Sequence, residues 1–492
     1  MKLDEIKQRQ LPAILNLERI QLISLVFVAI GILVRLVQYI NNRSLWGDEA
    51  ALARNIVNRS YLELFQPLDF DQAAPPGFLL IEKLAVSLFG DREYSLRLFP
   101  LLASFVALLA FYKLTYRYAS GIAAPIAIAL FACLKFTVYY STEVKQYSSD
   151  VMVALLLYLL LLPMRHRHLK PIQILQIALL GAVAIWLSHP AILVLASIEA
   201  VAFVTTPIRQ WRVKLLNRLP IYGFWVLNFS FIYFLSISKV ADNTALMSYW
   251  EPTYPDSPFD LWWLLDALGR FFYRPLGYEG LPEGIAMLAF VIGCVAYYRK
   301  SRATLLILLS PTIVTLLASY LQKYPFRERL ILFLVPFFIL ITAEGIGYLL
   351  THSRLQQFYS LPIIGILVAA ILLIPPVTRA AQLIVYPERK AELRPVIEYV
   401  KAHQKLEERL YIHRSGDRAF PYYAEKYGYQ QNDYVMGVDL ADIRQFQGLQ
   451  HIWLLASDTK EDEEILAALN SVGTQIDIFQ QPGAVAYLYA VK

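Results

Sequence analysis

The sequence is poor in charged side chains. Asp, Glu, Lys and Arg make up 17% of its 492 residues, and 57% of the residues are hydrophobic. Soluble domains carry about 25% charged residues. The deficit excludes an ordinary soluble protein and predicts a polytopic α-helical membrane protein.

Cysteine is also scarce. The two cysteines, Cys133 and Cys294, lie inside apolar runs, which excludes a disulfide framework and a thiolate metal site. The sequence lacks a glycine-rich phosphate loop and a repeat of fixed period. Its net charge of +6 comes from short basic clusters between apolar runs. We interpret these clusters as topology signals and expect no nucleic-acid partner.

About eleven apolar segments approach the length needed to cross a bilayer. They lie near residues 20–40, 97–117, 121–140, 149–164, 172–188, 190–207, 219–238, 283–298, 303–321, 329–350 and 358–376. Alternate connecting segments are basic, as in "RHRHLK" and "YYRKSR", and the positive-inside rule assigns them and the N-terminus to the cytoplasm. The remaining segments, including 41–96 and 239–282, are then extracytoplasmic in a multi-pass plasma (inner) membrane protein.

The tail has a different composition from the rest of the chain. We expect a membrane domain over residues 1–379, with 41–96 as its first outer loop, and a small extracytoplasmic α/β domain over 380–492. In the tail, "AELRPVIEYVKAHQ" and "TKEDEEILAALNSVG" predict helices. The segments "RLYIHR", "HIWLLAS" and "AVAYLYAV" predict strands.

The segment "SLWGDEA", residues 44–50, places Asp48 and Glu49 directly after the first apolar run. In one interpretation Asp48 is a helix N-cap, because an Asp side chain accepts backbone N–H bonds there. In the other it is catalytic, since a capping carboxylate keeps a second oxygen free. Neighbouring helical residues point about 100° apart, so we expect the two carboxylates not to serve one atom together.

Further polar residues gather in the expected outer segments. "YYSTEVKQYSSD" contains Glu143, Lys145 and Tyr147, and "SHP" contains His189. The structural alternatives are a solvated loop with interfacial tyrosines for the first segment and a helix-end residue for His189.

The last outer loop, "KYPFRERLILFL", carries cations against the charge rule, namely Lys323, Arg327 and Arg329. In one interpretation the arginines extend to the membrane surface. In the other, which we favour, they hold an anion, because Arg matches phosphate oxygens bidentately and stays charged. The candidate phosphate-binding residues are Arg327, Arg329 and Lys145, and the candidate substrate-binding residues are Glu143, Tyr147, His189 and Tyr324.

One carboxylate and several cations at the outer membrane border fit a particular chemistry. A glycosidase needs two carboxylates, because one must protonate an alkoxide leaving group. A phosphate leaving group needs cations instead, and a single carboxylate then suffices as the base for the acceptor hydroxyl. The pattern predicts sugar transfer from a lipid-linked phosphate, whose tail lies in the bilayer.

Four segments then carry a resemblance. "WGDEA", "APPGFLLIEKL…FGDREYSLRLFP", "YYSTEVKQYSSD" and "YPFRERLILFLVPF" resemble, in order and loop placement, the bacterial protein-mannosyltransferase-like membrane glycosyltransferases. These are of the GT-C fold class and glycosyltransferase family 39/83 type, with the aminoarabinose lipid A transferases as relatives. The resemblance covers most of residues 20–350 and implies a polyprenyl-phosphate sugar as donor.

The resemblance also implies roles for individual residues. In that family an acidic residue of the first outer loop is the catalytic base or orients the acceptor, which implies Asp48 with Glu49 in support. Basic residues near the late outer loop bind the donor phosphate, which implies Arg327 or Arg329, with Lys145 as a further candidate.

The chain departs from the family before the paired prolines of the second motif. Many members have a His there, where this chain has Ala73 and Ala74. The resemblance therefore implies no firm cofactor and leaves a divalent metal open. Three other functions stay open: a secondary transporter, a membrane scaffold or sensor, and a GT-C transferase with a lipid-diphosphate donor. A transporter keeps ionisable residues mid-membrane, and Arg35 is one of few charges inside an expected span.

Overall fold

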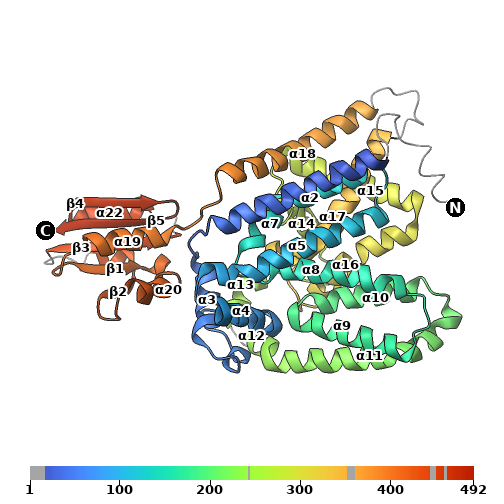
Figure 1. Ribbon diagram of the computed structural model, residues 1–492, viewed down its shortest axis with the longest axis horizontal. Helices are drawn as coiled ribbons and strands as arrows, with labels where there is room; N and C mark the ends of the chain where they lie inside the picture. The colour runs from blue at the N-terminus through green and yellow to red at the C-terminus, as the bar shows by residue number, and fades with distance from the viewer. Residues whose placement is uncertain (1–16, 242–243, 352–360, 444–449, 459–461) are drawn as a thin grey trace.

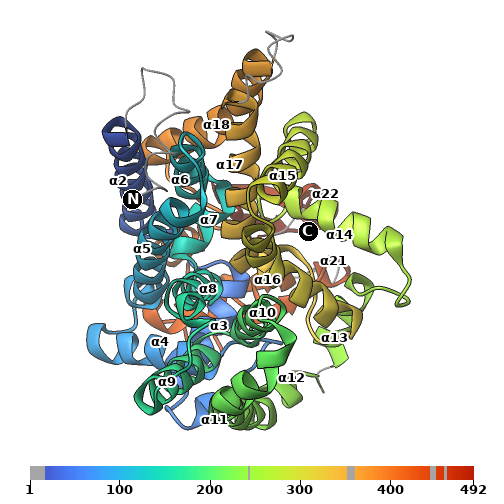
Figure 2. The same ribbon diagram turned by 90° about the vertical axis from the view of Figure 1, so that its right-hand side faces the viewer.

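The computed structural model describes residues 17–241, 244–351, 361–443, 450–458 and 462–492. Long helices form a bundle, and a small domain that contains a β-sheet lies at one end of it (Figure 1). Figure 2 views the bundle along its length. Below, the sheet-containing part is termed the C-terminal domain, and the end of the bundle next to it is termed the domain end.

Eight helical segments of the described chain are long and apolar enough to cross a membrane. They are α2 (Leu17–Ile40), α5 (Glu93–Tyr118), α8 (Tyr147–Leu161) with η3 (Leu162–Met164), η4 (Ile208–Gln210) with α11 (Trp211–Ile232) and η5 (Tyr233–Ile237), α15 (Leu281–Lys300), α16 (Arg302–Tyr320), η7 (Glu328–Leu334) with α17 (Val335–Thr351), and α18 (Leu361–Val385). A pair bent by 54° adds a ninth candidate, α6 (Ala123–Cys133) followed by α7 (Lys135–Tyr139) and η2 (Tyr140–Thr142).

The eleven expected apolar segments all coincide with helices, but not all of these helices are long enough to span. Two are shorter: α9 (Pro171–Leu187) has 17 residues and α10 (Ala191–Val204) has 14. The structure thus has eight or nine candidate spans among its described residues. Residues 358–360 of the last expected span lie outside those residues. The expected domain boundary after residue 379 falls inside α18, which continues to Val385.

The buried side chain of Arg35 lies at the break between α6 and α7. Its guanidinium, 1% exposed, donates to the backbone oxygens of Ala132 at 2.8 Å, Thr137 at 3.2 Å and Phe131 at 3.3 Å. A helix break frees carbonyl groups that need donors inside the membrane. Arg35 supplies them.

Two glycines let α15 and α17 approach closely. A Cβ atom on Gly293 would lie 1.8 Å from the carbonyl oxygen of Ile341, and one on Gly345 would lie 1.9 Å from that of Ala289. Small residues at helix crossings are the usual way to bring backbones together in a membrane. These contacts help to place α17 in the centre of the bundle.

The long loops lie at the domain end. The first contains α3 (Gly47–Asn58), η1 (Glu63–Phe65) and α4 (Pro76–Phe89), and a later one contains α12 (Ser238–Ala241), α13 (Thr244–Trp250), η6 (Glu251–Thr253) and α14 (Leu261–Tyr273). In Figure 1 α3 lies between the bundle and the C-terminal domain.

The C-terminal domain contains a five-stranded mixed sheet of order β2-β1-β3-β5-β4. β1 pairs in parallel with β2 and β3, whereas β5 pairs antiparallel with β3 and β4. Its elements are α19 (Leu393–His403), β1 (Arg409–His413), η8 (Arg414–Gly416), α20 (Phe420–Ala424), η9 (Glu425–Tyr427), β2 (Tyr434–Val438), α21 (Leu440–Ile443), β3 (His451–Ser457), α22 (Asp462–Val472), β4 (Gly473–Gln481) and β5 (Ala484–Val491). The predicted α/β domain is confirmed, with α19, α22, β1, β3 and β5 where the sequence indicated them.

The C-terminal domain shares a hydrophobic core with the first loop. Ile56 of α3 and Phe78 of α4 belong to the same cluster of buried residues as Val396, Phe420 and Trp453 of the domain. Burying a large apolar side chain stabilises by about 1.5–3 kcal/mol. This shared core fixes the domain against α3.

Candidate active site

Asp48 lies in the first turn of α3, at the domain end of the bundle. The helix begins at Gly47, and the N-cap residue is Trp46, with no side-chain cap hydrogen bond. The capping interpretation of Asp48 is therefore wrong, and its carboxylate is free for other partners. A negative charge in a first turn is favoured by the helix dipole.

Three cations surround that carboxylate. Arg329 Nη1 lies 3.0 Å and Lys145 Nζ 3.8 Å from Oδ2 of Asp48, while Arg418 Nη1 lies 3.6 Å from Oδ1. Burial acts to raise the pKa of Asp48, but Lys145, Arg329, Arg418 and a hydrogen bond from Gln72 outweigh it, so the pKa lies below its usual value. Asp48 is thus ionised at neutral pH. These five residues are termed the Asp48 cluster.

Lys145 is held inside the cluster by the loop that precedes α8. Its ammonium group donates to Oε1 of Gln72, and its side chain is 6% exposed. Burial lowers the pKa of Lys145, and the charge of Asp48 acts in the opposite direction. Gln72 comes from the polar stretch before the paired prolines, so two loops far apart in sequence meet here.

Glu49 points away from the cluster. It is fully buried, and Arg97 of α5 donates to both of its oxygens at 3.0 and 2.7 Å. The backbone N–H of Val144 donates to the same carboxylate at 2.9 Å. Burial acts to raise the pKa of Glu49, but Arg97 and Arg43 outweigh it, so the pKa is lowered. Glu49 joins α3, α5 and the loop that carries Lys145.

Glu143 lies next to this ion pair. It is 1% exposed, and Trp46 Nε1 donates to its Oε1 at 2.8 Å, whereas Oε2 has no hydrogen-bond partner. Burial and the neighbouring Glu49 raise the pKa of Glu143 to about 7. The Trp46 ring also faces the ammonium group of Lys390, 2.9 Å from the ring centroid. Trp46 therefore connects the first loop to the loop before α8 and to the segment that follows α18.

The two candidate arginines at the start of η7, Arg327 and Arg329, point to different partners. Arg329 joins the cluster, and its guanidinium carbon lies 5.9 Å from the ring centroid of Tyr147. Arg327 turns to α14, where its Nη1 lies 3.7 Å from Asp266. Tyr324 donates its hydroxyl to the backbone oxygen of Leu330 at 2.7 Å, which shapes the loop before η7.

His189 lies at the tight turn between α9 and α10. Its Nε2 is buried without a hydrogen-bond partner, and no recorded contact of the described chain joins it to the Asp48 cluster. Burial lowers the pKa of His189 to about 4, so the imidazole is neutral at pH 7. The structure therefore does not bring His189 together with Asp48, although it does so for Lys145, Tyr147 and Arg329.

Three residues at the site were absent from the sequence prediction: Gln72, Lys390 and Arg418. The polar stretch "DFDQ" before the paired prolines is the signal that could have indicated Gln72. No local signal marks Lys390 or Arg418, because their positions depend on how the C-terminal domain packs against α3.

The described residues offer no group of three or more His, Cys, Asp or Glu side chains that could hold a metal ion. Around Asp48 the partners are Lys145, Arg329 and Arg418. Divalent cations such as Mg²⁺ prefer several oxygen ligands, and three cations do not match that requirement. The donor set thus does not fit a divalent metal.

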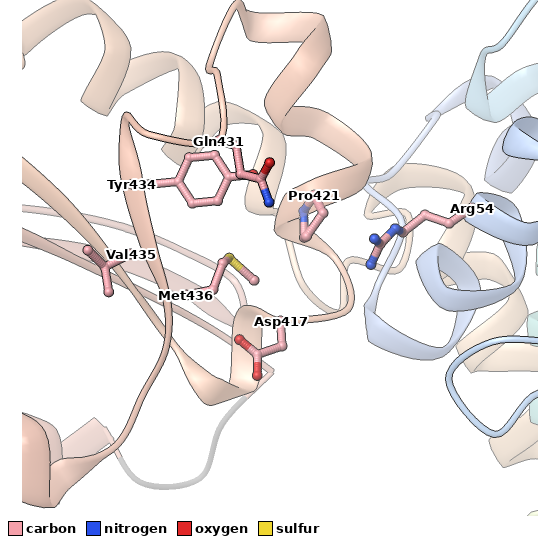
Figure 3. A pocket seen from close by; sticks show the side chains of 7 residues that line it. All are labelled: Arg54, Asp417, Pro421, Gln431, Tyr434, Val435 and Met436. Atoms are coloured by element: carbon pink, nitrogen blue, oxygen red, sulfur yellow. The ribbon is translucent and has the colours of Figure 1, made fainter.

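A cavity of about 530 Å³ opens between α3 and the C-terminal domain. Figure 3 shows Arg54 entering it from α3, opposite side chains of the domain. Its lining residues are Arg54, Asp417, Pro421, Gln431, Tyr434, Val435 and Met436. The lining combines charged, amide and aromatic side chains with the apolar Pro421, Val435 and Met436, so the cavity is of mixed polarity and open to solvent.

Comparisons with known proteins agree with this architecture. Residues 73–236 match the model of the dolichyl-phosphate-mannose-protein mannosyltransferase family. Among solved structures, ArnT from Cupriavidus metallidurans in the apo state superposes with a TM-score of 0.52 at 13% identity, covering 94% of this chain and 97% of that chain. The fold of this chain is similar to that of ArnT.

ArnT bound to undecaprenyl phosphate gives a TM-score of 0.51, again at 13% identity, with 94% of this chain and 97% of that chain covered. The comparison with curated protein sequences gives no match. The likeness to ArnT extends over the bundle and the C-terminal domain together, which makes the chain a polytopic GT-C fold with an appended α/β domain.

Proposed function

We propose that the chain is a membrane glycosyltransferase that moves a sugar from a polyprenyl-phosphate donor to an extracytoplasmic acceptor. The observation that carries the proposal is the convergence of one carboxylate, Asp48, with Arg329 and Lys145 at the domain end of the bundle. The match to a family of dolichyl-phosphate-mannose users and the structure of ArnT with undecaprenyl phosphate support this donor class.

In the proposed mechanism the donor phosphate binds Arg329 and Lys145. Asp48 accepts the proton of the acceptor hydroxyl while the acceptor oxygen bonds to the anomeric carbon. The bond from that carbon to the phosphate oxygen breaks, and the electron pair leaves with polyprenyl phosphate, whose charge the two cations stabilise. A single displacement of this kind inverts the anomeric configuration.

The same proposal includes the side of the membrane on which the Asp48 cluster lies. The loops far from the domain end are rich in Lys and Arg, as in 165–170 and 299–302, and the positive-inside rule places such loops in the cytoplasm. The Asp48 cluster and the C-terminal domain then lie on the extracytoplasmic side of the plasma membrane.

The test compares cells that lack the chain with cells that express the wild type or Asp48→Asn. Envelope lipids, glycans and proteins are analysed by mass spectrometry. One sugar modification should be lost without the chain, return with the wild type and stay lost with Asp48→Asn. That modification would identify the donor sugar and the acceptor class. Identical envelope profiles in all three strains would refute the proposal.

A further inference from the structure

Arg418 of the C-terminal domain reaches Asp48 directly. Arg418 lies between η8 and α20, and its guanidinium is 3.6 Å from Asp48 Oδ1 and 4.0 Å from Asp71 Oδ2. Its side chain is 45% exposed, so part of the guanidinium still faces solvent. A second arginine, Arg54, enters the adjoining cavity from α3 (Figure 3).

Hydrogen bonds of Arg394 and Tyr423 across the junction between the C-terminal domain and the bundle fix the part of the domain that carries Arg418. Arg394 donates to Glu93 at 2.9 Å and to the backbone oxygen of Asn42 at 2.6 Å. The hydroxyl of Tyr423 accepts from the backbone N–H of Leu45 at 2.7 Å and donates to Glu93 at 3.2 Å. Together with the shared hydrophobic core, these bonds hold the domain in one place over α3.

The two oxygens of Asp48 face different parts of the molecule. Oδ2 faces Arg329 and Lys145, which belong to the bundle, whereas Oδ1 faces Arg418 of the C-terminal domain. A lipid-linked donor approaches from the bundle, because its tail lies in the bilayer. The domain side, where Asp417 next to Arg418 lines the cavity, is thus left for the acceptor.

We propose that the C-terminal domain completes the active site, with Arg418 as a positioning residue that holds Asp48 from the acceptor side. This inference rests on the proposed glycosyl transfer. When the donor phosphate takes over Arg329 and Lys145, Arg418 remains as the cation that orients Asp48 and keeps it ionised. A base is effective only when it is held within hydrogen-bond reach of the proton it accepts.

The first test concerns position and needs no substrate. A Cβ on Gly47 would lie 3.9 Å from the Cβ of Arg418, within the range of about 3.5–4.5 Å that disulfides require. Gly47→Cys with Arg418→Cys, in a chain whose native cysteines are replaced, should cross-link on mild oxidation in native membranes. The control pair is Gly47→Cys with Leu406→Cys, since Leu406 is fully exposed. Peptide mass spectrometry without reduction detects the bond, and its absence in the first pair would overturn the placement.

The second test concerns the role of Arg418. Arg418→Ala should reduce sugar transfer at least tenfold while binding of undecaprenyl phosphate stays within twofold of the wild type. Arg418→Lys should restore transfer in part. Arg414→Ala, which removes a domain cation paired with Asp439 at 3.1 Å, is the matched control and should transfer like the wild type.

The pH profile separates positioning from a loss of structure. Arg418 lowers the pKa of Asp48, so that pKa should rise when the cation is removed. The acid limb of the pH–rate profile for sugar transfer should then move to higher pH by up to about one unit. A structural defect lowers transfer equally at every pH. Arg418→Ala with wild-type transfer and an unmoved acid limb would refute the positioning role. Absence of the sugar modification from wild-type cells would instead refute the underlying function.

Discussion

Arg329 Nη1 and Asp48 Oδ2 form an ion pair of 3.0 Å that joins the start of η7 to the first turn of α3. The pair connects a residue proposed to bind the donor phosphate with the residue proposed as the base. A phosphate that binds Arg329 competes with Asp48 for the same guanidinium. When the donor phosphate binds Arg329, the Asp48 carboxylate should therefore lose part of the stabilisation that this cation provides. Its basicity then increases at the step in which it accepts the proton of the acceptor hydroxyl.

The separation of Arg329 from Arg327 gives the first prediction. Arg329→Ala should weaken binding of undecaprenyl phosphate about 10–150-fold, because a charge-assisted hydrogen bond of about 1.5–3 kcal/mol is lost. Arg329→Lys should recover only part of the affinity, since the planar fork is lost. Binding is measured on purified protein by tryptophan fluorescence or calorimetry.

Arg327→Ala is the matched control for this experiment. It lies two residues away and pairs with Asp266 of α14, so its loss should change the affinity less than threefold. Equal weakening by both alanine variants would mean that the loop acts through its net charge, and unchanged affinity in Arg329→Ala would return Arg329 to a role at the membrane surface.

A second prediction distinguishes Glu49 from its neighbour Asp48. Glu49→Gln should lower the thermal stability strongly, because it leaves the guanidinium of Arg97, which is 2% exposed, without its anionic partner. Breaking a buried pair from one side costs about 3–5 kcal/mol. Replacing both partners, as Glu49→Leu with Arg97→Met, should recover much of that loss. The midpoint of thermal unfolding in detergent measures the effect, and a Glu49→Gln protein of wild-type stability but without activity would favour a catalytic role.

Much of the fold could be predicted because membrane insertion is encoded locally. Apolar segments marked every spanning helix, and the tail strands β1, β3 and β5 are apolar and buried. The edge strands β2 and β4, many of whose residues are exposed, were not predicted. The length of α10 was overestimated, since 190–207 was expected and the helix is Ala191–Val204, whereas α9 has the expected 17 residues.

The site was predictable only where its residues lie on the bundle loops. Asp48, Lys145 and Arg329 could be predicted because they are charged residues at the ends of apolar runs. The divergence of Arg327 depends on a local backbone feature, since Glu328 between the two arginines has a φ of 44°, which lies in the left-handed region. Arg418 depends on the docking of two parts that are far apart in the sequence, and no local pattern carries that information.

The third prediction concerns topology. His168 lies in an exposed loop far from the domain end, and Leu406 is an exposed residue of the C-terminal domain. In a background without the native cysteines, Leu406→Cys should react with a membrane-impermeant maleimide in intact spheroplasts. His168→Cys should react only after the membrane is opened. The opposite labelling pattern would place the Asp48 cluster in the cytoplasm and exclude the proposed sidedness.

The fourth prediction uses the raised pKa of Glu143, about 7. A carboxyl whose pKa is higher in the folded than in the unfolded state stabilises the fold at low pH. This contribution is complete below about pH 4.5 and is lost as the pH rises to about 7. The loss amounts to about 3–4 kcal/mol, because each pH unit between about 4.5 and 7 contributes about 1.4 kcal/mol. Glu143→Gln, which still accepts from Trp46, should remove this dependence and be the more stable protein at pH 8. The midpoints of thermal unfolding of both proteins between pH 5 and 8 measure this pH dependence. The prediction is contradicted if the midpoints of the wild type and Glu143→Gln change in parallel with pH.

The last prediction concerns Asp48 itself. Asp48→Asn keeps the size of the side chain but cannot accept a proton, so transfer should fall at least about 100-fold. The same change removes a negative charge beside Arg329 and Lys145, where the donor phosphate is proposed to bind. Undecaprenyl phosphate should therefore bind the Asn variant as tightly as the wild type or more tightly. Reduced activity with unreduced affinity is the signature of a base, since a residue needed for folding or for donor binding would lower both. The two measurements are made on the same purified variants, with Asp48→Glu to test whether a displaced carboxylate retains part of the rate. An Asn variant that transfers sugar at the wild-type rate would exclude Asp48 as the base.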